Sequence, residues 1–375
     1  MIDTLDKLAD ERLTPVLFVG EDVDEDLLLP FRKLKHVEIV RSIVFDGARN
    51  RARLAAAFML GKDTAAEKLF VDHVIDTVFE PAAFYGWRFP IPAIAWIPDF
   101  QHRQLPQLFS RATYWKREIR CRLQAASGRH MLLSSEDARK DCEFFFPASR
   151  GRTSVVRFAV LPKDEALAHD PGEIANLYGL PERFYYLPNQ FWKHKNHTLV
   201  IEALSQLVAR GINITVAVSG KQDDPYNPDH YASIEKLIET TGVARHFRVL
   251  GMIPYEHLIA LMRGCRALIN PSLCEGWSTT VEEAKSLGVP MLLSNLSVHL
   301  EQAPRGTVFF DPLSANELAD RIVAFEQRPE SDRKSSEKAA ISAAGDRVKQ
   351  YATDFADTVE RTLAVRRGDP DKAVI

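Results

Sequence analysis

The chain has 375 residues, of which 46% are hydrophobic and 26% are charged, and its formal net charge is -3. This length favours two domains over one, and the small net charge gives no reason to expect a nucleic-acid partner. No apolar run approaches the roughly 18 residues that span a membrane, and the N-terminal residues do not resemble a signal peptide, so we expect a cytoplasmic protein. The four cysteines lack metal-ligand spacing and are predicted to be reduced thiols.

The first half of the chain alternates strand-like and helix-like runs. Strands are predicted over residues 16–20, 37–40, 92–97, 130–134 and 155–160. Helices are predicted over residues 4–11, 51–60, 65–78 and 114–126, and a further helix begins after the capping residue Ser135. A polar linker is predicted to open at Pro162.

The second half repeats this alternation. Strands are predicted over residues 185–188, 214–220, 247–251, 267–270, 290–294 and 307–310. Helices are predicted over residues 197–210, 231–241, 255–263 and 315–326, and the tail over residues 331–363 is helical in pattern. Such alternation predicts parallel sheets covered by helices, which bind ligands at the carboxyl ends of their strands.

Glu275 and Glu283 are the most informative pair of residues. Glu275 lies in a loop after the apolar run 266–272, and Glu283 lies in a predicted helix that ends at Gly288. A strand, a loop of small and hydroxyl residues and the N-terminus of a helix make an anion site. Two carboxylates beside such a site suit a ligand that carries both phosphates and hydroxyls.

Charged side chains in other loops are weaker candidates. Lys195, with Lys193 beside it, follows the strand at 185–188 and could neutralise a phosphate, although both could equally be solvated loop charges. Asp99 and His102 follow the strand at 92–97, and His102 could position a hydroxyl or could be satisfied by loop carbonyls.

Two charged segments are interpreted as structural. The helix at 111–122 carries five basic residues with aromatic and aliphatic ones between them; a solvated face is favoured, and peripheral contact with the inner face of a membrane is the alternative left open. The acidic run at 21–26 is interpreted as the start of a helix rather than as a metal site. Because there is no glycine-rich phosphate loop, we expect lysine, helix ends and backbone amides to neutralise phosphate, without a metal.

The segment 271–290, with Glu275, Glu283 and Gly288, resembles the E-x7-E signature of glycosyltransferase family 4, which has the GT-B fold. The resemblance runs from about residue 185 to 325, and residues 190–197 resemble the family branch that reads Q-F-W-x-H-K-N-H. It is looser in the first half, through residues 97–102 and 133–135. It implies an α/β protein with two Rossmann-like domains whose parallel sheets face a central cleft. The expected divisions are an acceptor-side domain at 1–162, a donor-binding domain at 163–345, and a C-terminal helix at 346–375 that returns to the first domain.

The resemblance also implies roles for single residues. Glu275 would contact the donor sugar, Glu283 the ribose and Lys195 the diphosphate, with His102 near the transferred sugar and Asp99 on the acceptor side. The remaining donor-binding residues implied are Gln190, Lys193, Gly251, Ser272, Gly276, Trp277, Ser278, Thr279 and Thr280.

Two departures from the family pattern are visible. Gln190 stands where many members carry an arginine, so more of the phosphate neutralisation would rest on Lys195. The family usually begins with a strand and a glycine-rich loop, whereas this sequence begins with what resembles the first helix. We therefore expect a gap or an exposed edge in the N-terminal sheet and a poorly active polypeptide.

The function implied is transfer of a hexose, with retention, from a UDP- or GDP-linked donor to a glycan or lipid-linked acceptor, without metal or cofactor. The alternatives are a sugar-nucleotide-binding protein without catalysis, another GT-B enzyme such as a sugar-nucleotide epimerase, and a module that binds membrane surfaces.

Overall fold

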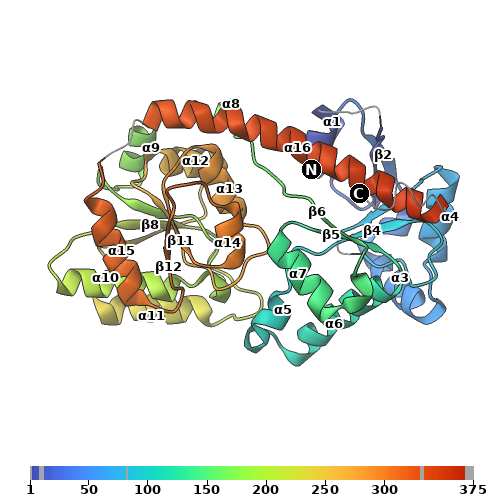
Figure 1. The fold of residues 1–375 in the computed structure, drawn as a ribbon, viewed down its shortest axis with the longest axis horizontal. Coiled ribbons are helices and arrows are strands. Elements are labelled where there is room, and N and C mark those ends of the chain that lie inside the picture. The colour runs from blue at the N-terminus through green and yellow to red at the C-terminus, as the bar shows by residue number, and fades with distance from the viewer. Residues whose placement is uncertain (1, 8–11, 82, 330–332, 368–375) are drawn as a thin grey trace. The chain divides into compact units, whose positions relative to one another are not determined.

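The computed structural model describes residues 2–7, 12–81, 83–329 and 333–367, and its chain is an α/β protein made of two compact units (Figure 1). The first unit consists of Met1–Phe100, Trp115–Phe158 and Arg347–Ile375, and the second of Gln101–Tyr114 and Ala159–Asp346. None of the described helices is both long enough and apolar enough to cross a membrane.

The second unit is built on a six-stranded parallel sheet in the order β12-β11-β10-β7-β8-β9. The strands are β7 (Tyr185–Leu187), β8 (Val216–Ser219), β9 (Phe247–Gly251), β10 (Leu268–Asn270), β11 (Met291–Ser294) and β12 (Val308–Phe310). The chain winds outward in one direction from β7 to β9 and in the other from β10 to β12. The strand order therefore reverses between β7 and β10, which is where open parallel sheets bind ligands.

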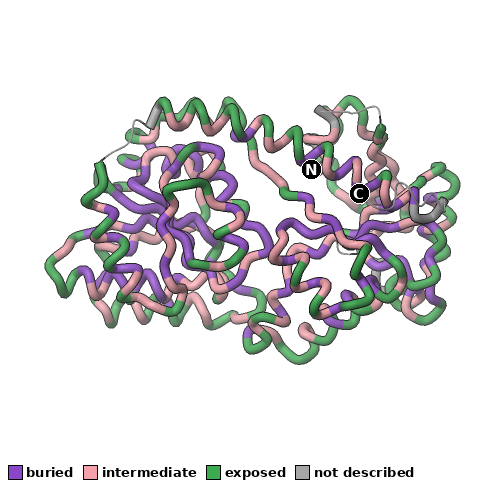
Figure 2. Tube along the Cα trace, in the orientation of Figure 1, coloured by how far each residue is buried: buried purple, intermediate pink, exposed green. Residues whose placement is uncertain are grey.

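Helices cover both faces of this sheet. Successive residues of β7 point to opposite faces: Tyr185 and Leu187 pack in one core cluster, and Tyr186 packs in the other. Figure 2 shows the buried residues concentrated along these strands. The helices of the unit are α5 (Gln101–Gln104), α8 (Asp164–Leu167), α9 (Pro171–Leu177), α10 (His197–Ala209), α11 (His230–Thr241), α12 (Tyr255–Gly264), α13 (Thr279–Ser286), α14 (Ser297–Gln302) and α15 (Ala315–Glu326).

The first unit contains two parallel sheets, and among its described residues no strand joins one to the other. One sheet pairs β1 (Val16–Val19) with β2 (Glu38–Arg41), and the other has the order β3 (Val78–Glu80), β4 (Ala93–Trp96), β5 (His130–Leu133), β6 (Thr153–Val155). Its helices are α1 (Ile2–Lys7), α2 (Glu25–Arg32), α3 (Gly47–Leu60), α4 (Thr64–Asp72), α6 (Arg111–Ala126) and α7 (Glu136–Phe145).

The last helix, α16 (Arg333–Arg367), is 35 residues long. In the first unit its Tyr351, Phe355 and Val359 pack against Ile94 of β4 and Leu132 of β5. The helical tail predicted over 331–363 is therefore present from residue 333, and residues 331 and 332 lie outside the described part. Residues 8–11 of the first predicted helix lie outside it as well.

Two predicted elements of the first half are wrong. The single helix predicted over 65–78 ends at Asp72, because Val74 adopts a positive φ of 54° that no helix continues through, and Val78 then begins a strand. The strand predicted over 155–160 is instead β6, which ends at Val155. The amide of Val156 still donates to the carbonyl of Leu133 in β5 at 2.8 Å, but residues 156–160 belong to no strand.

Candidate functional site

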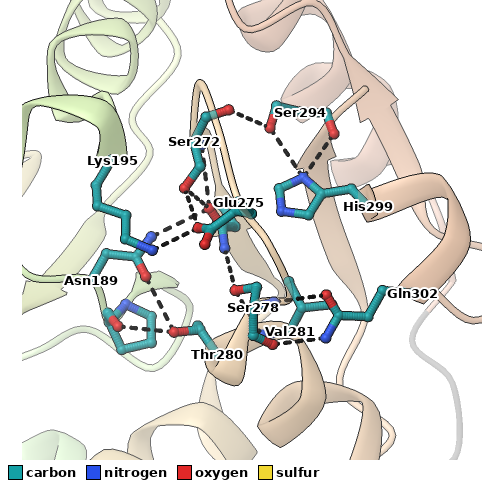
Figure 3. A network of polar contacts seen from close by, with 12 residues as sticks. Asn189, Lys195, Ser272, Glu275, Ser278, Thr280, Val281, Ser294, His299 and Gln302 are labelled. Atoms are coloured by element: carbon teal, nitrogen blue, oxygen red, sulfur yellow. Dashed lines mark hydrogen bonds and ion pairs between the residues drawn. The ribbon is translucent and has the colours of Figure 1, made fainter. Parts of the chain in front are cut away.

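Three neighbouring strands place the site. β7 ends at Leu187, β10 at Asn270 and β11 at Ser294, and the segments that follow them all begin at the carboxyl edge of the same sheet. These segments carry Lys195, Glu275 and His299, respectively, and Figure 3 shows the three side chains in one polar network. Residues 80 positions apart in sequence therefore meet because the strands before them are parallel and adjacent.

Lys195 and Glu275 form the centre of the network. The lysine Nζ lies 2.6 Å from Oε1 of Glu275, and the two side chains are only 16% and 9% exposed. Oγ of Ser272 lies 2.7 Å from the same carboxylate oxygen. Burial opposes ionisation of Glu275, but the positive charge of Lys195 and the nearby His299 and His194 outweigh it and lower its pKa to about 2.

Asn270 holds the loop that carries Glu275. Asn270 is the last residue of β10 and is fully buried, and its Oδ1 accepts a hydrogen bond from Oγ of Ser272 at 2.7 Å. Its Nδ2 donates to Oγ of Ser278 at 3.1 Å, and Ser278 in turn caps α13. On the neighbouring segment, Asn189 donates to Oδ1 of Asn270 at 3.3 Å. The ends of β7 and β10 are thus joined by side-chain amides.

The segment at 189–196, which carries Lys195, is held by hydrogen bonds of Asn196 and Lys193. Asn196 has a left-handed backbone with a φ of 57°, and its Nδ2 donates to the carbonyls of Pro271 at 3.1 Å and Pro312 at 2.8 Å. The backbone amide of Lys193 donates to Asp224 at 3.0 Å. Lys195 is therefore presented to Glu275 by a fixed loop rather than by a free one.

Glu283 lies on α13, where it is buried, and its carboxylate accepts a hydrogen bond from the hydroxyl of Tyr255, the first residue of α12. Burial raises the pKa of Glu283 to about 7, against the lowering effect of that hydrogen bond. Gly251, which ends β9, has a φ of 71°, and its carbonyl accepts from the amide of Gly220 at 2.9 Å.

The other predicted donor-binding residues fall into two groups. Gly276, Trp277 and Ser278 are buried between Glu275 and α13, Thr279 begins that helix, and the hydroxyl of Thr280 lies 3.2 Å from Oδ1 of Asn189. Gln190 and Lys193 are exposed. No hydrogen bond from either side chain to Glu275 is present among the described residues.

The residues predicted from the first half have structural partners. Oδ1 of Asp99 pairs with Arg117 at 2.6 Å. The ring of His102, on α5, is fully buried and packs edge to face against Tyr114. Arg122 of α6 pairs with the buried Glu118, while Trp115 and Ile119 of that helix are about half exposed, at 54% and 45%.

The acidic run at 21–26 is also structural. Asp24 caps α2 by accepting from the amide of Asp26, and Asp22 accepts from the amide of Gly47. The described residues contain no group of three or more His, Cys, Asp and Glu side chains arranged to hold a metal ion.

Asn189, Asn270, Ser294, His299 and Gln302 belong to the network but were not predicted from the sequence. Gln302 bonds both the amide and the carbonyl of Ser278, at 3.1 and 2.7 Å. Nδ1 of His299 lies 2.9 Å from the carbonyl oxygen of Ser294. For Asn189, Asn270 and Ser294 the available signal was their position, since each ends or closely follows a strand of the parallel sheet, whereas His299 and Gln302 lie on α14.

Comparison with known proteins bears on both the site and the fold. Residues 179–341 match the family model described as Glycosyl transferases group 1. The curated alpha-1,3/1,6-mannosyltransferase ALG2 of Mus musculus is 23% identical over 203 residues, which make up 49% of this chain and 48% of that protein. The chain therefore matches about half the length of this curated relative.

Solved structures resemble the chain over nearly its whole length. A glycosyltransferase from Rickettsia africae aligns with a TM-score of 0.67 and 14% identity, covering 98% of this chain and 93% of that one. HepE of Anabaena, in complex with UDP and glucose, aligns with a TM-score of 0.66 and 17% identity, covering 96% and 94%. A sucrose-phosphate synthase from Thermosynechococcus elongatus aligns with a TM-score of 0.63 and 14% identity, covering 97% and 91%.

At such identities these likenesses establish the fold alone, which is GT-B, as the sequence resemblance predicted. The family match covers the six-stranded sheet together with the loops and the helix that carry Lys195, Glu275 and Glu283. Residues 179–341 therefore match the model of the group 1 glycosyltransferase family, within a chain that has the GT-B fold.

Proposed function

We propose that the chain is a retaining glycosyltransferase that moves a hexose from a UDP- or GDP-linked sugar to a glycan or lipid-linked acceptor, without a metal or cofactor. The observation that carries this proposal is the Lys195–Glu275 pair, held with Ser272 at the point where the strand order reverses. The group 1 domain and a fold neighbour crystallised with UDP and glucose support a nucleotide-sugar donor.

The diphosphate would lie between Lys195 and the N-terminus of α13. Cleavage of the bond between sugar and phosphate builds negative charge on the leaving oxygen. A lysine that is already fixed, together with the amides and hydroxyls of residues 276–280 at a helix N-terminus, stabilises that charge without having to reorganise. Lys195 is held in this way by the bonds of Asn196 and Asp224.

The two carboxylates would bind different hydroxyls of the donor. Glu275 is ionised and nearly buried, so it can accept hydrogen bonds from the sugar and orient it. Glu283, on the next helix, would accept from the ribose. His102 remains our candidate for a contact with the transferred sugar, and we assign no residue as the base that deprotonates the acceptor.

The first test is binding. A thermal-shift panel of UDP, GDP, ADP and dTDP should identify one base, because a ligand that binds only the folded chain raises its stability by mass action. A chain that none of these nucleotides stabilises would contradict the donor proposal.

The second test separates the proposed enzyme from its alternatives. A transferase that binds the nucleotide should release it from the matching sugar donor and pass the sugar to an acceptor. Binding without release would indicate a sugar-nucleotide-binding protein, and a change in the sugar without release would indicate an epimerase.

A further inference from the structure

His299 lies in the network around Glu275 and has no role in the proposed binding of the donor. It is fully buried on α14, with Nδ1 2.9 Å from the carbonyl oxygen of Ser294 and 3.1 Å from its Oγ. Because a carbonyl can only accept, Nδ1 carries the hydrogen of the neutral ring. Nε2 is then the nitrogen with a free lone pair.

Nε2 of His299 has no hydrogen-bond partner among the described residues, although it is buried. A buried acceptor of this kind is costly unless it has a function or gains a partner. Figure 3 shows it on the side of the ring that faces Glu275, while Nδ1 points to Ser294. The carboxylate and the ring also act on each other electrostatically: burial lowers the pKa of His299, and the negative charge of Glu275 opposes that lowering.

A bound donor would weaken the Lys195–Glu275 contact. Lys195 has one ammonium group, and in this structure that group lies 2.6 Å from Glu275. A diphosphate carries at least two negative charges and would compete for it. If Lys195 turns to the phosphates, Glu275 loses the partner that offsets its desolvation, and an unpaired carboxylate in this place is strongly disfavoured.

We propose that His299 is a positioning residue for Glu275, and that it takes up a proton on Nε2 and binds the carboxylate when the donor diphosphate draws Lys195 away. The proton comes from solvent, and its charge replaces that of the ammonium beside Glu275. The charged and titratable groups that face the pair are Lys195 and His194, both in the turn Lys193–Lys195. The proposal rests on the proposed function through the diphosphate alone, because Glu275 and His299 interact electrostatically without any ligand.

The electrostatic interaction between His299 and Glu275 can be tested without any measurement of activity. Titration of the His299 imidazole, followed by heteronuclear NMR of its two nitrogens, should give a neutral ring with the hydrogen on Nδ1 at neutral pH. Glu275→Gln should lower the pKa of His299 because it removes the opposing negative charge, and Lys195→Met should raise it. The nucleoside diphosphate selected by the thermal-shift panel should also raise it. A pKa that neither variant moves would overturn the proposal.

The role in catalysis can be tested with two variants that differ by one methylene. His299→Asn places an amide where Nδ1 donates to Ser294 but leaves nothing at Nε2, whereas the longer side chain in His299→Gln reaches the Nε2 position. We expect kcat of His299→Asn to fall at least about tenfold, with a much smaller change in the donor KM, and His299→Gln to recover part of the loss. A wild-type kcat in His299→Asn would contradict the proposal, as would an equal loss in both variants together with weaker nucleotide binding.

A matched control comes from His246, whose Nδ1 makes a similar bond of 2.9 Å to the carbonyl of Ile214 in the same unit. His246→Asn should leave kcat unchanged. A lower kcat in this variant would show that losing a bond between Nδ1 and a backbone carbonyl is enough to reduce turnover. If the wild-type chain neither binds nor turns over a donor, the proposed function fails, and the two variant titrations still decide whether His299 faces Glu275.

Discussion

Glu275 and Glu283 are carboxylates of the same domain, and their surroundings move their pKa values in opposite directions. Glu275 has Lys195 at 2.6 Å, and its pKa falls to about 2. Glu283 has a neutral phenol as its partner, and burial raises its pKa to about 7. At neutral pH the first is fully ionised and the second is only about half ionised, which suits one to orienting a sugar and makes the other sensitive to pH.

Nucleotide affinity should depend on the ionisation of Glu283. Ribose hydroxyls donate more strongly to a carboxylate than to a carboxylic acid, so affinity should rise as the pH increases through about 7. The hydroxyl of Tyr255 lowers this pKa, so Tyr255→Phe should move the midpoint to higher pH. Calorimetric titrations between about pH 6 and pH 8.5 would measure both effects. Glu283→Gln is the control, and a midpoint that persists in it would assign the titration to another group.

Lys195→Met should destabilise the chain because it leaves Glu275 ionised and nearly buried. We expect a loss of about 3 kcal/mol in the free energy of unfolding at neutral pH, from urea denaturation. The folded pKa of Glu275, about 2, lies below its ordinary value of 4.5, so its stabilising effect is present above pH 4.5 and is lost as the pH falls towards 2. The difference between wild type and variant should therefore shrink in acid. If the unfolding free energies of wild type and Lys195→Met differed equally at neutral and at acidic pH, the Lys195–Glu275 pair would not be the cause of the destabilisation.

At the scale of elements, the position of Lys195 depends on the turn that follows it. Asn196 combines a left-handed backbone with two hydrogen bonds, to the loops after β10 and β12. This one side chain therefore links the segments that follow three strands of the sheet. Asn196 therefore fixes the segment that carries Lys195 relative to the loop that carries Glu275.

Substitutions at Asn196 separate the backbone from the side chain. Asn196→Gly keeps the left-handed conformation at no steric cost but loses both hydrogen bonds, so we expect a loss of about 2 kcal/mol in unfolding free energy. Asn196→Ala loses the same bonds and adds strain of about 1 kcal/mol. Urea denaturation measures the unfolding free energy of each variant, and both variants should bind the nucleotide more weakly than wild type. If Asn196→Ala were as stable as wild type, the turn would not be fixed in this way.

At the scale of the whole molecule, the sequence was sufficient for the elements whose pattern is local. The strand, loop and helix around Glu275 and Glu283 could be predicted because an apolar strand, a loop of small and hydroxyl residues and Gly288 each leave a short-range signal. β3 was missed because its residues continue an apolar run that a helix also fits. The helix ends just before Val74, which has a positive φ of 54°, and the spacing of apolar residues does not encode that turn.

The network partners of Glu275 could not be predicted in the same way. Ser294 and His299 lie in its network only because β10 and β11 are neighbours, and strand order is not written in the spacing of residues. A polar residue just after a parallel strand is a candidate from sequence alone. Which candidates meet depends on the topology.

The central claim is that the site around Glu275 transfers the sugar of a nucleotide donor. The most direct measurement is the rate at which nucleoside diphosphate is released from the matching donor, at saturating concentration and with acceptor present, by wild type and by Glu275→Ala. We predict release by wild type and a rate at least about a hundredfold lower in the variant, while thermal stabilisation by the nucleotide alone stays nearly the same. Equal rates in the two proteins, or nucleotide binding by a wild type that releases nothing, would contradict the account.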